Sequence, residues 1–457
     1  MKKFLATAVL LCAALYINGK ELKELQQAFV DLKFGMFIHF NIPTFTNHDW
    51  PDPDASPAIF NPAKLDCSQW ARAARAAKMK YGCLTAKHHS GFCIWKTKTT
   101  DYNVMNSPLK RDVVEEYVNA FRKEGLRTML YFSILDTHHR LRPGFINRSH
   151  IDFVKAQITE LLTAYGEIDA LIIDGWDAPW SRISYEEIPF EEIYRLVKKL
   201  QPNCLLMDLN AAKYPAEMLF YTDIKSYEQG AGQHIEKEAN RLPALSCLPI
   251  QKNWFWKETF PKAPVKDPAS LVKDNLEPLN GAYCNFILNV APNRDGLIDD
   301  NAMAALRKIG ELWKDDLPYP ALPDFDKPII SANIAKRQPA NSSWSDDMMI
   351  MDFGNDDNYR TAWEANPETA EPWLEINFPS YRSFNVITVY DTRKCIRKYS
   401  LMYEKDGEWT TIVTAENDRR IKVHRFEPVR GTKVKIVILE STAPPAIAEM
   451  GVFEESF

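Results

Sequence analysis

Residues 165–176 read YGEIDALIIDGW, and this stretch shows how the first two thirds of the chain fold. The segment before it, from Ile151, places apolar side chains at helical spacing and ends at Gly166, a residue type that commonly follows the last turn of a helix. Ala170–Ile173 is continuously apolar, which is typical of a strand buried on both faces. Asp174 follows directly. The stretch therefore predicts a helix, a buried strand and a carboxylate at the carboxyl end of that strand.

The same alternation extends in both directions from this stretch, over about residues 30 to 315. Amphipathic segments, such as those that begin after Asp66 and at Asp300, separate short apolar runs. The apolar runs are FGMFIHF (34–40), YGCLTAK (81–87), TMLYFS (128–133), ALII (170–173), CLLM (204–207), TDIKSY (222–227) and YCNFILNV (283–290). Strand and helix alternate about seven or eight times, a rhythm that predicts a (β/α)8-like barrel.

The segment LPYPALPDFDKP (317–328) is rich in proline and ends this alternation. Beyond it, short strand-like runs such as TVYD, SLMY, TTIV and VKIVIL are separated by turn residues, without a long helical pattern. Such a pattern is typical of a β-sandwich. We therefore expect an α/β chain with a (β/α)8-like barrel over residues 20–317, a linker over 318–328 and an all-β sandwich domain over 329–457.

The first 19 residues have the character of a signal peptide. Lys2 and Lys3 precede an apolar stretch, Phe4–Ile17, that is too short to span a bilayer. Gly19 is a plausible last residue of the cleaved segment. We expect the protein to be secreted or periplasmic, without a membrane span.

Composition excludes several classes of protein. With 457 residues, 46% of them hydrophobic, the chain is long enough to bury more than one core. A formal net charge of −5, without a run of Lys or Arg, excludes a nucleic-acid partner. The eight cysteines are scattered and form no CxxC pair, so neither a disulfide framework nor a structural zinc site is expected.

Polar residues interrupt the apolar runs at their carboxyl ends, which is where barrel enzymes place their chemistry. Each could be an ordinary polar residue at a strand end, but together they indicate one site. Asp177 competes with Asp174 for the role of the reactive carboxylate, although it lies further into the loop. The residues at strand ends are His39, His88, His89, Asp174, Lys225 and Glu228.

The pair His88-His89 raises the question of a metal. Adjacent residues of a strand point to opposite faces, whereas metal-binding histidines are normally spaced H-x-H or lie four apart on a helix. Neutral imidazole both donates and accepts a hydrogen bond, which matches a sugar hydroxyl. We therefore expect no metal and no cofactor, and a buried structural histidine remains the alternative for one of the two.

Several motifs resemble the family-29 α-L-fucosidases, in the same order along residues 30–315. They are FGMFIHF (34–40), NHDW (47–50), TAKHHSGFCIW (85–95), YGEIDALIIDGW (165–176) and NFILNVAPNRDG (285–296). The resemblance implies a retaining glycoside hydrolase with a pocket for α-L-fucose at the mouth of the barrel, and a fucosylated oligosaccharide or glycoconjugate as substrate.

The same resemblance implies roles for individual residues. By position, Asp174 is similar to the catalytic nucleophile, and Glu228, in KSYEQ (225–229), is similar to the acid/base residue of one subgroup. Trp256, in NWFWK (253–257), is similar to a wall for the methyl group of fucose. The remaining residues with an implied role in binding the sugar are His39, Asp49, Trp50, His88, His89, Trp95 and Tyr131.

The chain also departs from the family pattern at two places. Asp49 stands where relatives often carry a glutamate, and it is shorter by one methylene. The arginine that some relatives carry after the fifth strand has no counterpart in LLMDLNAAKYP (205–215), where Asn210 is only a weak substitute.

The second domain resembles discoidin-like (F5/8 type C) sandwiches, through TAWEANPETAEPWLEINFP (361–379), YSLMYEKDGEWTTI (399–412) and AEMGVFE (448–454). Such a domain either binds carbohydrate or braces the barrel. For the whole chain three alternatives to an exo-acting α-L-fucosidase remain: an α-L-galactosidase of the same family, a glycan-binding protein without turnover, and a metal-dependent hydrolase.

Overall fold

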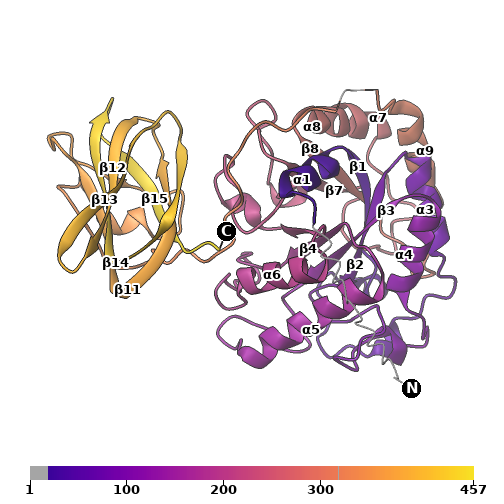
Figure 1. The fold of residues 1–457 in the computed structure, drawn as a ribbon. Coiled ribbons are helices and arrows are strands. Elements are labelled where there is room, and N and C mark those ends of the chain that lie inside the picture. Colours follow the sequence, from indigo (N-terminus) through magenta and orange to yellow (C-terminus); the bar gives the residue numbers. More distant parts are fainter. Residues whose placement is uncertain (1–18, 317–318, 457) are drawn as a thin grey trace, which may run out of the picture.

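The computed structural model describes residues 19–316 and 319–456. The signal peptide expected over residues 1–19 therefore lies outside the described residues, apart from Gly19. Figure 1 shows a barrel wrapped by helices and, beside it, a smaller domain built of strands. Both parts of the fold expected from the sequence, the (β/α)8-like barrel and the β-sandwich, are confirmed.

Eight strands form the barrel sheet, in the order β5-β4-β3-β2-β1-β8-β7-β6, and all neighbouring pairs are parallel. Between β5 and β6 the ring is bridged by the backbone N–H of Asp223, which donates to the carbonyl of Leu206 at 2.8 Å. The strands are β1 (Phe34–Ile38), β2 (Tyr81–Lys87), β3 (Arg127–Ser133), β4 (Ala170–Asp174), β5 (Leu205–Asp208), β6 (Lys225–Glu228), β7 (Ala244–Pro249) and β8 (Cys284–Asn289).

Helices cover the outside of this sheet (Figure 1). Local sequence fixes where several of them begin: Asp66 and Asp112 accept backbone N–H bonds at the starts of α3 and α4, and Asn147 forms a capping box with His150 at the start of α5. The helices are α1 (Leu22–Val30), α2 (Ile42–Thr46), α3 (Cys67–Ala76), α4 (Val113–Lys123), α5 (Arg148–Ala164), α6 (Phe190–Leu200), α7 (Pro268–Ser270), α8 (Glu277–Gly281) and α9 (Asp300–Leu312), with the short turns η1 (Pro57–Ile59), η2 (Val104–Asn106), η3 (Ala211–Lys213), η4 (Gln229–Ala231), η5 (Leu271–Leu276) and η6 (Met351–Gly354).

The second domain is one strongly bent antiparallel sheet around its own apolar core, which includes Trp363, Ile376 and Ile436. Its strand order is β10-β15-β11-β14-β12-β13, and β9 pairs with β11. Register shifts within the long strand β11 mark where the sheet bends. The strands are β9 (Ala340–Ser342), β10 (Trp363–Glu364), β11 (Trp373–Asp391), β12 (Ile396–Lys405), β13 (Glu408–Glu416), β14 (Ile421–Ser441) and β15 (Ala446–Phe453).

The sandwich packs against the loop that follows β5. Phe220 of this loop pairs with Ile329 in an isolated β-bridge and contacts the ring of Phe453, with ring centroids 6.1 Å apart. Tyr214 meets Tyr359 edge-on, with centroids 5.7 Å apart. The aromatic rings between the two domains therefore connect the sandwich to the barrel edge at which the site lies. Over residues 19–316 and 319–456, every helix is too short or too polar to span a bilayer.

Candidate active site

The alternation of side chains along β4 directs Asp174 into the barrel. Ala170 and Ile172 belong to the apolar cluster inside the barrel, whereas Leu171 and Ile173 pack beneath the outer helices. Asp174 continues the inward set by one step, at the carboxyl end of the strand. The strand thus delivers a carboxylate to the mouth of the barrel, above an apolar floor.

Asp174 is only 6% exposed and accepts two side-chain hydrogen bonds. The hydroxyl of Tyr131, on β3, donates to Oδ2 at 2.7 Å, and the amide of Asn210, just after β5, donates to Oδ1 at 2.8 Å. Burial raises the pKa of Asp174 above its ordinary value, and the two side-chain bonds and the N–H of Gly175 oppose that rise. The hydrogen bonds to its two oxygens therefore fix the orientation of the carboxylate, and the group remains able to ionise.

Glu228, at the end of β6, is the second carboxylate of the site. Its Oε1 accepts a bond of 3.0 Å from the indole N–H of Trp254. Burial and then the charge of Asp174 raise the pKa of Glu228 to about 7, against the opposing effect of the Trp254 bond. Two neighbouring carboxyl groups in different surroundings can hold different protonation states, as a nucleophile and a general acid must.

The two carboxylates share a pocket of about 170 Å³. Aromatic and apolar side chains form much of its wall, and a few polar groups converge within it, as is typical of sites that bind small molecules. The pocket is lined by Phe37, His39, Asp49, Trp50, His88, His89, Asp174, Trp180, Leu209, Glu228, Trp254 and Phe255.

Three histidines project into this pocket as neutral rings. Burial lowers the pKa of His39 and of His89 to about 3, and lowers that of His88 as well. His39 Nδ1 donates to Asn289 at 2.8 Å, which leaves Nε2 as an acceptor. His89 Nδ1 lies 2.7 Å from the hydroxyl of Ser133, which itself donates to the carbonyl of Leu135.

His88 and His89 each have a ring nitrogen to which the described residues offer no short hydrogen bond. His88 Nδ1 is buried without a hydrogen-bond partner among the described residues. His89 Nε2 lies 3.8 Å from Asp174 Oδ2. Buried polar atoms are normally paired, so an unpaired nitrogen on a residue that lines the pocket is typical of a functional site. Within residues 19–316 and 319–456, no group of three or more His, Cys, Asp or Glu side chains is arranged to hold a metal ion.

Some tryptophans that the sequence assigned to the pocket lie elsewhere. Trp95 is fully buried and donates to Glu160 of α5 at 3.0 Å, so it supports the wall of the barrel from outside the pocket. Trp256 is 8% exposed and donates to Asp299 at 2.7 Å. Neither side chain lines the pocket. Tyr131 lies beneath it and holds Asp174.

Trp50 and Trp180 form the exposed aromatic rim instead. Trp50 stacks on His89, with centroids 4.9 Å apart, and Trp180 meets the edge of Trp50 at 5.5 Å. Their residues are 49% and 39% exposed. Trp50 was expected here, and Asp49, which pairs with Lys257 at 2.5 Å, also lines the pocket as expected.

Sequence reasoning did not identify Trp180, Trp254, Phe255, Leu209 or Phe37 as pocket residues. Trp254 and Phe255 lie within NWFWK (253–257), so the motif was noticed and its second tryptophan was chosen. Phe37 precedes His39 by two positions, and the period of a strand could have revealed that both face inward. Trp180 belongs to an irregular loop and carries no such signal.

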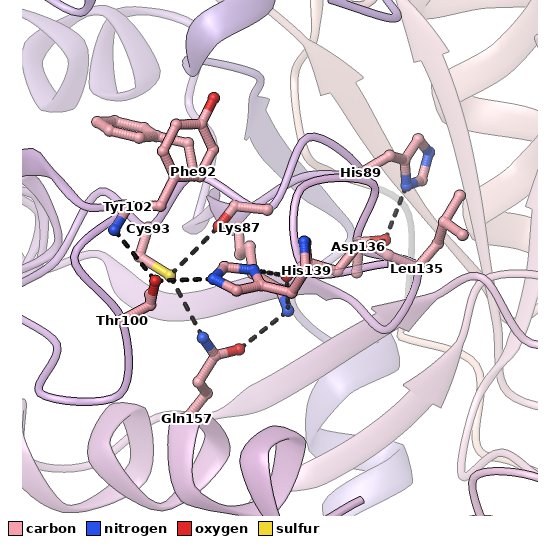
Figure 2. A network of polar contacts seen from close by, with 12 residues as sticks. Lys87, His89, Phe92, Cys93, Thr100, Tyr102, Leu135, Asp136, His139 and Gln157 are labelled. Atoms are coloured by element: carbon pink, nitrogen blue, oxygen red, sulfur yellow. Dashed lines mark hydrogen bonds and ion pairs between the residues drawn. The ribbon is translucent and has the colours of Figure 1, made fainter. Parts of the chain in front are cut away.

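A buried polar network supports the loop that carries His88 and His89. Figure 2 shows Lys87 between Asp136 and Gln157, at 3.3 and 2.9 Å. Asp136 also accepts from the ring of His139 at 2.9 Å. Although burial acts to raise it, the Lys87 ammonium and then His139 lower the pKa of Asp136 to about 2. Lys87 directly precedes the two histidines, so this ion pair anchors the start of their loop.

Asp136→Asn tests the importance of this anchor. Lys87 and Asp136 are both fully buried, and removing one charge leaves the other without compensation, at a cost of about 3–5 kcal/mol in the free energy of unfolding. The matched control is Asp152→Asn, because Asp152 pairs with Arg148 at the surface, where such a pair contributes about 1 kcal/mol or less. Denaturant unfolding measures both. Equal losses in the two variants would show that the buried pair has no special role.

Comparisons with known proteins agree with this geometry. A family model described as alpha-L-fucosidase matches residues 45–316, more than half of the chain, and an F5/8 type C domain model matches residues 334–450. Alpha-L-fucosidase 1 of Arabidopsis thaliana is 28% identical, over 92% of this chain and 85% of its own length. Tissue alpha-L-fucosidase of Homo sapiens is 24% identical, over 59% of this chain and 63% of its own length.

Solved structures share the fold. Alpha-L-fucosidase isoenzyme 1 from Paenibacillus thiaminolyticus has a TM-score of 0.52 at 22% identity and covers 92% of this chain and 100% of its own. A GH29 fucosidase of Ruminococcus gnavus, solved in complex with fucose, has a TM-score of 0.51 at 19% identity, over 95% of this chain and 94% of its own. The match of the family model over the barrel decides the assignment: the chain belongs to the alpha-L-fucosidase family of glycoside hydrolases and carries an F5/8 type C domain behind its catalytic barrel.

Proposed function

We propose that this enzyme releases terminal α-L-fucose from fucosylated oligosaccharides or glycoconjugates by a retaining double displacement. The observation that supports this most strongly is the pairing of Asp174, held by Tyr131 and Asn210, with Glu228, whose pKa is raised to about 7. A retaining glycosidase needs one ionised carboxylate that attacks and one protonated carboxyl group that donates.

In the first step, Asp174 attacks the anomeric carbon of fucose. The bond between that carbon and the glycosidic oxygen breaks, and Glu228 transfers its proton to the departing oxygen. The Tyr131 hydroxyl and the Asn210 amide fix the direction of both carboxylate oxygens, which reduces the motion needed to reach the sugar. The product of this step is an ester between Asp174 and fucose.

In the second step, the ionised Glu228 takes a proton from water, and the resulting nucleophile attacks the same anomeric carbon. The bond to Asp174 breaks, and fucose leaves with its original configuration. Glu228 suits both duties because a carboxyl group with a pKa of about 7 loses and regains a proton readily near neutral pH.

The neutral histidines and the apolar wall favour a sugar with hydroxyls on one side and a methyl group on another. His39, His88 and His89 present ring nitrogens, whereas Phe37, Leu209 and Phe255 present only carbon. An additional unpaired hydroxyl, as on the C6 of L-galactose, costs about 1–3 kcal/mol against such a wall. This argues for fucose over L-galactose. The presence of both carboxylates in one pocket argues against a glycan-binding protein without turnover.

Export from the cytoplasm is part of the same proposal. Its support is the sequence of residues 1–19, in which two lysines precede a short apolar stretch. Such a leader would direct the enzyme out of the cytoplasm.

Asp174→Ala tests the nucleophile. Turnover of an aryl α-L-fucoside should fall roughly 10⁴- to 10⁶-fold, as in other enzymes that lose a central catalytic group, while the protein folds normally. Added azide should restore part of the rate and give a product of inverted configuration, because the small anion fits the space left by the side chain. Asp169→Ala is the control, because Asp169 directly precedes β4 and therefore lies at the opposite end of the strand from Asp174. Retained turnover in Asp174→Ala would disprove the assignment.

The pH dependence of kcat/KM tests Glu228. Activity should fall as the pH rises through about 7, because Glu228 must carry a proton to assist the leaving group. Trp254→Phe removes the bond that favours the ionised form, so the pKa of Glu228 should rise and the alkaline limb should move to higher pH.

Glu228→Gln should abolish the alkaline limb and slow natural fucosides about 10²- to 10⁴-fold, with a smaller effect on substrates that have good leaving groups. Glu258→Gln is the control, because Glu258 pairs with Arg294 outside the pocket. An unchanged alkaline limb in Glu228→Gln would show that another group is the acid.

A further inference from the structure

Ion pairs link two loops beside the nucleophile to the same residue of the sandwich, Asp357. The second residue of the loop after β5 is Asn210, which holds Asp174 Oδ1 and also donates its backbone N–H to Asp208 at 2.9 Å. The loop after β4 begins with Gly175, directly next to Asp174, and continues through Asp177 and on to Glu186. The placement of both loops therefore decides how the nucleophile is aimed.

Two lysines connect these loops to the sandwich. Lys213, three residues after Asn210, forms an ion pair with Asp177 and lies 3.8 Å from Asp357. Lys336 lies 3.0 Å from Asp357 and 3.4 Å from Glu186. The two ammonium groups thus meet at one carboxylate of the sandwich, and each also contacts an acidic residue of the loop after β4.

Asp357 is itself firmly placed. Its backbone N–H donates to Glu449 at 3.0 Å, and Glu449, which is buried in β15, accepts a second bond of 2.9 Å from Asn333. The Asp357 side chain is 13% exposed, so water screens its ion pairs less than it would screen pairs at an open surface. The Asp357 carboxylate is therefore held in place and can fix the positions of the two lysines that pair with it.

Aromatic packing aligns the same elements. Tyr185, in the loop after β4, donates to Asp208 at 2.6 Å, and the Lys213 ammonium lies 5.4 Å from the centre of its ring. Tyr214, next to Lys213, contacts Tyr359 of the sandwich. A shift of the sandwich relative to the barrel would therefore displace Lys213, then Asn210, and so change the orientation of Asp174.

We propose that Asp357 is a positioning residue for catalysis: through Lys213 and Lys336 it keeps the two loops in the arrangement in which Asn210 holds Asp174. The sandwich is then a supporting part of the active site in this chain. The inference relies on the proposed role of Asp174 as nucleophile, and it assigns no contact with substrate to Asp357.

The first experiment compares Asp357→Asn with the wild type on an aryl α-L-fucoside. The amide has nearly the same size but no charge, so kcat should fall about 2- to 30-fold, the range typical of residues that couple to a site through others. KM should change less than kcat, because the three histidines that bind the sugar lie outside these two loops, which contribute only Trp180 and Leu209 to the pocket wall. Asp357→Glu should recover part of the loss, and Asp347→Asn, at an exposed place of the same domain, should leave kcat unchanged.

The second experiment is a double-mutant cycle with Asn210→Ala. If Asp357 acts through Asn210, the double variant should have nearly the same kcat as Asn210→Ala alone. If the two residues act independently, the fold-losses in kcat of the two single variants should multiply. Multiplying effects, or an unchanged kcat in Asp357→Asn, would overturn the proposal.

A crystal structure of Asp357→Asn gives a readout that does not depend on activity. The contact of 2.8 Å between Asn210 and Asp174 should lengthen or become disordered, and an undisturbed contact would again overturn the proposal. A wild-type enzyme without turnover of fucosides would contradict the proposed function instead, so the two failures are distinguishable.

Discussion

The structure of the site depends on one constraint: the Asp174 carboxylate is buried and must still be able to carry a charge. Burial of an ionised carboxyl group costs several kcal/mol unless hydrogen bonds compensate. Here Tyr131, Asn210 and the N–H of Gly175 supply them, each from a different segment next to β4. The hydroxyl and the amide also fix the direction of the carboxylate, so the groups that make the charge tolerable are the groups that aim it.

The same constraint sets the second carboxyl group apart. Burial and then the charge of Asp174 raise the pKa of Glu228 to about 7, and only one side-chain bond, from Trp254, opposes that rise. One carboxylate is stabilised and its neighbour is kept protonated at mildly acidic pH. Three hydrogen bonds oppose the effect of burial at Asp174 and one opposes it at Glu228, where the charge of Asp174 acts in addition. The proposed mechanism uses this difference to separate the attacking group from the proton donor.

Regular elements could be predicted from the sequence because their signals are local. The run ALII before Asp174 and the alternation of apolar runs predicted the barrel, and the ends of those runs identified Asp174, Glu228 and the histidines as a group that the structure brings into one pocket. The family resemblance was confirmed by the match over residues 45–316.

Loops could not be predicted in the same way. NWFWK (253–257) offers two tryptophans, and the bond from Trp254, in the loop after β7, to Glu228, at the end of the neighbouring strand β6, decides which one enters the pocket. Trp95 follows the histidines closely in sequence, yet its indole turns outward to Glu160 on α5. Asn210 looked like a weak replacement for an arginine, and only the approach of β4 and β5 shows that it holds Asp174. Such long-range contacts leave no periodic trace in a single sequence.

The central claim is that Asp174 forms the covalent bond to fucose, and trapping that bond tests it most directly. A 2-deoxy-2-fluoro-α-L-fucosyl fluoride forms the ester quickly, because fluoride leaves easily, but releases it slowly. Peptide mass spectrometry of the inactivated protein should find the fluorofucosyl group on the peptide that contains Asp174 and on that side chain. Attachment to Glu228 or to another carboxylate, or release of fucose with inverted configuration and no labelled protein, would contradict the account.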